Sequence, residues 1–123
     1  MYDVDYFIRK FEKIPEFLWC INRRHDSKGG HCAHGWCNLD DIGYSDEENA
    51  LRKLASFFGY YGVGPINNGD DKRYQQPTPK QRILAALYDI KKLQQPQHTD
   101  ITKQLAVLPI DETSDLTLIK SNV

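Results

Sequence analysis

Residues 20–37 concentrate the side chains that could bind a metal ion. This stretch holds all three cysteines and three of the four histidines. Thiolates and imidazoles are the ligands that zinc prefers, so the candidate ligands are Cys20, His31, Cys32 and Cys37. The spacing opposes a zinc site, because gaps of 11 and 4 residues separate the cysteines, whereas structural sites use C-x2-C knuckles. We therefore expect no metal or cofactor, and cysteines that pack as small apolar side chains.

The same stretch could also supply a cysteine nucleophile. Cys32 lies shortly after the Gly29-Gly30 turn and at the expected start of a short helix, where the helix dipole favours a thiolate. His31 is the candidate general base, with His34 and His25 as alternatives. Cys32 and His31 would then be the catalytic residues of a hydrolase or transferase. Because His31 is adjacent to Cys32 and would have to fold back, we keep this reading as the alternative and favour a protein that is not an enzyme.

A second group of side chains points to recognition rather than catalysis. Large aromatic side chains near loops are typical of binding surfaces. Residues 60–73 are rich in glycine and asparagine and predict a loop. The candidate binding residues in and beside it are Tyr60, Tyr61, Asn68, Asp70 and Tyr74.

Charge and hydropathy narrow the class of partner. The net charge is -1 and the isoelectric point is near 6.4, which disfavours a nucleic-acid-binding protein, since such proteins carry an excess of lysine and arginine. No apolar run approaches the roughly 18 residues that cross a bilayer, and the N-terminus lacks the pattern of a secretory signal. We expect a cytoplasmic protein with reduced thiols that binds another protein or a second copy of itself.

Three amphipathic helices must position these side chains. Residues 4–14 repeat apolar types at helical spacing, with Asp3 or Asp5 as the cap. Ser45 and Glu48 form a capping-box pattern before a second helix that should end near Gly59. Thr78, followed by a proline, begins a third helix that should end near residue 95.

With the remaining segments, the predicted fold class is mainly α (α+β). We expect a small two-stranded β element over residues 19–35, with a short helix beginning near Cys32. Residues 1–95 should form the helical domain. Residues 96–123 should be a linker followed by a hairpin, a short helix or a tail. The predicted core is Phe7, Phe11, Trp19, Cys32, Leu51, Leu54, Phe58, Ile83, Leu84 and Leu87.

Several longer stretches resemble a family of short uncharacterised phage, prophage and bacterial proteins. The resemblance covers about residues 6–92. It lies in the motifs IRKFEKIPE, WC, GHCAHG, INNGD and YQQPTPKQRILAAL, at residues 8–16, 19–20, 30–35, 66–70 and 74–87. The family brings no established activity. This chain departs from it at His34, where the family usually has leucine. A polar residue at an apolar position needs either solvent or a partner.

Together these patterns predict a non-enzymatic accessory or protein-interaction module of a mobile genetic element. A Cys32-centred hydrolase or transferase and a small zinc-binding domain are the alternatives.

Overall fold

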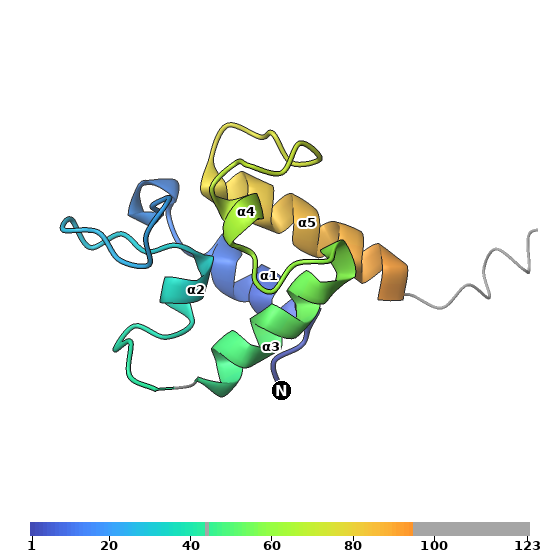
Figure 1. The fold of residues 1–123 in the computed structure, drawn as a ribbon, viewed down its shortest axis with the longest axis horizontal. Coiled ribbons are helices and arrows are strands. Elements are labelled where there is room, and N and C mark those ends of the chain that lie inside the picture. The colour runs from blue at the N-terminus through green and yellow to red at the C-terminus, as the bar shows by residue number, and fades with distance from the viewer. Residues whose placement is uncertain (44, 95–123) are drawn as a thin grey trace, which may run out of the picture. The chain divides into compact units, whose positions relative to one another are not determined.

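Three helices form the framework of the computed structural model, which describes residues 1–43 and 45–94. They are α1 (Val4–Glu12), α3 (Asp46–Ala55) and α5 (Pro79–Gln94) (Figure 1). The three main helices predicted from periodicity are therefore confirmed. Residues 1–93 form one compact unit. The expected hairpin, short helix or tail after residue 95 lies outside the described residues.

Local hydrogen bonds explain where the three helices begin. The side chains of Asp3, Ser45 and Thr78 each accept the backbone N–H of the residue three positions later, at 2.8, 3.1 and 3.2 Å. Such caps satisfy N–H groups that have no partner within the helix. The structure thereby decides between the two expected caps of α1 in favour of Asp3.

The core lies between these helices and is largely the predicted one. Seven of the ten predicted residues are buried, and these are Phe7, Phe11, Trp19, Leu51, Leu54, Ile83 and Leu87. The other three, Cys32, Phe58 and Leu84, are half-buried. Phe58 and Leu84 still pack against the core. Cys32 differs because it lies at the start of a helix whose outer side is open.

The expected two-stranded element is absent from the described residues, and this prediction was wrong. Two single-residue bridges take its place, Trp19 with His31 in parallel and His25 with His31 in antiparallel. The pairing stops for a local reason. Asn22 has φ of 63°, so the chain turns three residues after Trp19, while Cys32 caps a helix one residue after His31.

Short helices fill the segments between the long ones. They are the 3₁₀ helices η1 (Glu16–Leu18) and η2 (Ser56–Phe58), and the one-turn helices α2 (Ala33–Trp36) and α4 (Gly64–Asn67). The prediction of a helix starting near Cys32 is confirmed by α2. Helix α4 corrects the prediction of an uninterrupted loop over residues 60–73.

Arg82 holds α4 against α5. Its guanidinium is buried and donates to the backbone carbonyls of Ile66, Asn67 and Gln76, at 3.2, 2.8 and 2.8 Å. Two of these carbonyls lie at the end of α4, where helical carbonyls lack internal partners. A contact with α5 thus stabilises a helix too short to persist alone.

Within residues 1–43 and 45–94, no helix is both long and apolar enough to span a lipid bilayer.

Candidate functional site

A pocket of about 360 Å³ opens beside α2 and α4. Its walls come from the loop before α2, from α2 itself and from α4. The lining residues are Asn22, Arg23, Arg24, Cys32, His34, Gly64, Asn67 and Asn68. The pocket therefore gathers amides, guanidinium groups and a thiol from segments that are far apart in the sequence.

The thiol of Cys32 reaches this pocket because of how α2 begins. Cys32 is the N-cap, and its Sγ accepts the backbone N–H of Gly35 at 3.4 Å. Gly35 is required here, since a Cβ atom would lie 2.2 Å from the carbonyl oxygen of Arg24. The close approach of the Arg24 backbone to α2 leaves Cys32 half-buried at the pocket wall. The sequence-based placement of this thiol in the core was wrong.

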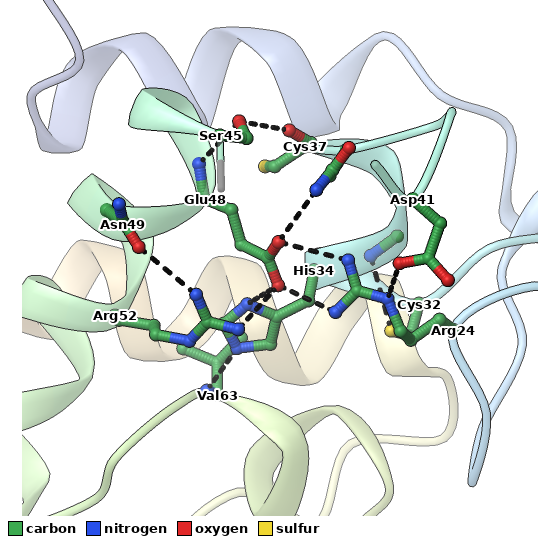
Figure 2. Close-up of polar contacts among 12 residues, drawn as sticks. Arg24, Cys32, His34, Cys37, Asp41, Ser45, Glu48, Asn49, Arg52 and Val63 are labelled. Carbon is green, nitrogen blue, oxygen red and sulfur yellow. Dashed lines mark hydrogen bonds and ion pairs between the residues drawn. The ribbon is translucent and has the colours of Figure 1, made fainter. Parts of the chain in front are cut away.

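Glu48 of α3 is the centre of a charged cluster that includes the pocket residues Arg24 and His34 (Figure 2). Its carboxylate is 2% exposed. Arg24 donates to both carboxylate oxygens, at 2.7 and 3.0 Å, and Arg52 donates to one at 3.0 Å. Burial alone would raise the pKa of Glu48, but the hydrogen bonds and charge of the two arginines hold it below its usual value. The sequence assigned Glu48 to a capping box, yet its carboxylate contacts these arginines.

His34 is buried beside Glu48. Its Nε2 accepts the backbone N–H of Val63 at 2.8 Å, so the proton of the neutral ring sits on Nδ1. Nδ1 lies 3.3 Å from Glu48 Oε2. Burial lowers the pKa of His34 to about 4. His34 is therefore a neutral structural group whose only lone pair is occupied, and it cannot serve as a base for Cys32.

The candidate base His31 contacts a second imidazole. The Nδ1 atoms of His25 and His31 lie 2.7 Å apart, which requires a single proton between them. The His31 ring also stacks edge-on against Trp36, with centroids 4.5 Å apart. Burial lowers the pKa of His31. Among the described residues no hydrogen bond joins a cysteine sulfur to a histidine nitrogen, so the geometry pairs His31 with His25 and not with Cys32.

The proposed zinc ligands occupy separate environments. Cys37 is 4% exposed, and burial raises the pKa of its thiol well above its ordinary value. Cys20 and Cys32 are half-buried on the side of the loop before α2. Within the described parts of the chain, no three histidine, cysteine or acidic side chains are arranged to hold a metal ion.

Asn67 joins two segments that lie far from it in the sequence. Its side chain is 1% exposed. Its Oδ1 accepts the N–H of Ala33 at 3.1 Å, and its Nδ2 donates to the carbonyl of Cys20 at 2.9 Å. One amide thus joins α4 to α2 and to the loop that precedes it. The INNGD motif marks a turn, but no local pattern reveals these distant partners.

Three of the candidate binding residues are aromatic and differ in exposure. Tyr74 is 5% exposed and belongs to the core. Tyr60 is half-buried and donates its hydroxyl to Asp71 at 2.7 Å. Tyr61 is 89% exposed, with the Arg52 guanidinium 5.8 Å from its ring centroid. The other two candidates separate as well, since Asp70 is exposed whereas Asn68 lines the pocket.

A search of family models, curated proteins and solved structures finds no match for this chain.

Proposed function

We propose that this chain is a non-enzymatic protein-interaction module that receives a short segment of a partner protein at the pocket. The observation that carries the proposal is that His31 and His34 already have hydrogen-bond partners other than Cys32. Nε2 of His34 accepts the backbone N–H of Val63, and Nδ1 of His31 shares a hydrogen bond with Nδ1 of His25. Among the described residues, the pocket therefore offers groups that bind, and neither of these two histidines is free to act as the general base that would activate the thiol.

The pocket walls favour a partner segment with a carboxylate. Arg23 is exposed at the pocket, and no described acidic side chain forms an ion pair with it. Arg24 is shared between Glu48 and Asp41, at 2.7 and 2.9 Å. Arginine binds carboxylates through two parallel hydrogen bonds, and the neighbouring amides can donate further ones. Charge complementarity thus selects an acidic residue as the centre of the bound segment.

An apolar neighbour of that acidic residue is also favoured. Phe17 and Ile21 are 82% and 43% exposed, and they precede the pocket-lining residues 22–24 in the sequence. A volume of about 360 Å³ suits one or two side chains. We infer a segment with an acidic and an apolar or aromatic residue close together. The resemblance to phage and prophage proteins supports a partner encoded by the same mobile genetic element.

A displayed library of random peptides, selected on the purified chain, tests this proposal. Enriched peptides should combine an acidic with an apolar residue, and their dissociation constants can be measured by fluorescence anisotropy. Arg23→Glu should weaken binding about tenfold or more, since a charge-assisted hydrogen bond is lost and repulsion is added. Lys72→Glu makes the same charge change at an exposed position outside the pocket and should bind as the unaltered chain does. Equal binding by the Arg23→Glu variant would overturn the assignment.

The alternative hypothesis, a cysteine enzyme, is tested separately by the rate at which Cys32 reacts with iodoacetamide. Its nucleophile would react with iodoacetamide at neutral pH faster than a free thiol does. Our proposal expects Cys32 to react no faster than that, and expects Cys32→Ser to retain peptide binding.

A further inference from the structure

Cys20 and Cys32 each directly follow one residue of a bridged pair, Trp19 and His31. The N–H of His31 donates to the carbonyl of Leu18 at 3.0 Å, and the N–H of Cys20 donates to the carbonyl of His31 at 3.2 Å. These two bonds define the parallel bridge between Trp19 and His31. The next pair along both segments is Cys20 and Cys32. In a parallel pair, residues in register point to the same side, with backbones about 5 Å apart.

A buried side chain joins the two segments where the direct backbone pairing ends. The amide of Asn67 donates to the carbonyl of Cys20 and accepts the N–H of Ala33, at 2.9 and 3.1 Å. Ala33 directly follows Cys32, so one amide group contacts the backbone at both cysteines. A disulfide requires Cα atoms within about 4.4 to 6.8 Å of each other, and the bridge one residue earlier brings the two segments together.

Two neighbouring carbonyl groups fix the same pair from the other side. The thiol of Cys20 donates to the carbonyl of Arg23 at 3.3 Å, and the N–H of Cys32 donates to the carbonyl of Arg24 at 3.1 Å. Both cysteines are free and half-buried, and Cys32 is reached from the pocket. After burial, the charge of Cys32 is the next cause that raises the pKa of Cys20. The two thiols are therefore electrostatic neighbours.

The remaining cysteine faces elsewhere. Cys37 is buried, and the charged groups that act most on its thiol are Glu47 and Lys10. Those two side chains form an ion pair with each other. Cys37 thus provides an internal control for any chemistry of the other pair.

We propose that Cys20 and Cys32 form a reversible redox site that closes to an intramolecular disulfide by exchange with a low-molecular-weight disulfide of the glutathione class. The Cys32 thiolate attacks one sulfur of oxidised glutathione, which forms a mixed disulfide and releases one glutathione thiolate. The Cys20 thiol then loses its proton to water and attacks Sγ of Cys32, which releases the second glutathione thiolate. Two protein thiols are oxidised, and one oxidised glutathione is reduced to two glutathione molecules.

Formation of this disulfide would constrain the loop that lines the pocket. The disulfide would close a ring over residues 20–32, which includes the pocket residues Asn22, Arg23 and Arg24. It would also remove the thiol hydrogen that Cys20 donates to Arg23. The proposal rests on the position of the two cysteines, one residue past the Trp19–His31 bridge, and does not depend on peptide binding.

The test uses the full chain, first reduced and freed of reductant, then incubated with excess oxidised glutathione near pH 8, where thiolates are accessible. Intact mass spectrometry should show the loss of two hydrogens, reversed by dithiothreitol. Trypsin cuts after Arg23, Arg24 and Lys28 but not between Cys32 and Cys37, so chymotrypsin is added to cut after Trp36. The disulfide should then appear as one linked pair of peptides that contains Cys20 and Cys32 and lacks Cys37. A link from Cys32 to Cys37, or separate glutathione adducts that persist on Cys20 and Cys32, would overturn the proposal.

Two variants sharpen the result. Cys20→Ser should stop at a stable glutathione adduct on Cys32, because the resolving thiol is missing. Loss of two hydrogens in this variant would contradict the assignment. Cys37→Ala should form the disulfide as the unaltered chain does. If that buried substitution prevents folding, the peptide map of the unaltered chain still decides which cysteines are joined.

Discussion

Arg24 and Glu48 form a two-point ion pair in which both Nη atoms of the guanidinium donate to the two oxygens of a buried carboxylate. This pair joins the loop before α2 to the first turn of α3. Arg52, one turn later on α3, donates to the same carboxylate at 3.0 Å. The loop before α2 is therefore tied to a carboxylate that is removed from water and whose charge is compensated by these two arginines.

Removing the Glu48 carboxylate should destabilise the fold. We expect Glu48→Ala to lower the free energy of unfolding by about 3 kcal/mol, because the partly buried Arg24 loses its compensating charge. Chemical denaturation measures the change. Asp46→Ala removes an exposed carboxylate from the same helical turn and should alter stability by no more than about 0.5 kcal/mol. Equal effects of the two substitutions would show that Glu48 acts only through the helix dipole.

The buried amide of Asn67 should also stabilise the fold, because it is the hydrogen-bond partner of two backbone groups. Asn67→Ala leaves the N–H of Ala33 and the carbonyl of Cys20 without their partner. We expect a loss of about 2 to 3 kcal/mol in denaturant unfolding. Asn68→Ala removes a side chain that is only half-buried and should cost about 1 kcal/mol or less. A ranking in the opposite order would contradict the role assigned to Asn67.

Stability should fall on acidification because of His34. Its pKa is about 4 in the folded chain and 6.5 in the reference state. Between these values the unfolded chain binds more protons, so the free energy of unfolding rises with pH from about 4 to about 6.5 and then levels off. The contribution of His34 is on the order of 3 kcal/mol. The pKa of His31 is also lowered, as is that of Glu48, so these groups change stability in the same direction.

His34→Leu provides the control for this titration. The substitution should reduce the slope of unfolding free energy against pH between about 4 and 6.5. At neutral pH it should cost about 1 to 3 kcal/mol, because the N–H of Val63 loses its acceptor. Denaturant titrations across this pH range measure both effects. An unchanged slope would assign the pH dependence to other groups.

Two glycines should respond to alanine in opposite directions. At Gly35 a Cβ atom would meet the Arg24 carbonyl at 2.2 Å, so backbone must move. We expect Gly35→Ala to cost about 2 to 3 kcal/mol or more. At Gly64, in the first turn of α4, nothing lies within 4 Å of the added atom and φ is not positive. Gly64→Ala should stabilise by about 0.4 to 1 kcal/mol. Thermal or denaturant unfolding distinguishes the two signs.

Helix positions and caps could be predicted because their causes are local. The apolar spacing of residues 4–11 and the caps at Ser45 and Thr78 involve groups within a turn of one another. Each lies in a short window of sequence. Even the start of α2 at Cys32 follows from the turn before it.

The site could not be predicted because its contacts cross long stretches of chain. Arg24 reaches Glu48 over 24 residues, and Asn67 reaches Cys20 over 47. Local pattern made Glu48 part of a capping box and placed Cys32 in the core. Packing of α2 against the Arg24 backbone instead put that thiol at the pocket wall.

The sequence by itself determined a mainly helical unit, its three long helices and most of its core, since burial follows apolar periodicity. Only the tertiary structure decided which histidine nitrogens already have a hydrogen-bond partner, which acid compensates Arg24, and that Cys20 and Cys32 each follow a residue of the Trp19–His31 bridge. The physical reason is that a buried polar group takes whatever partner packing places next to it, and residue spacing does not encode that partner.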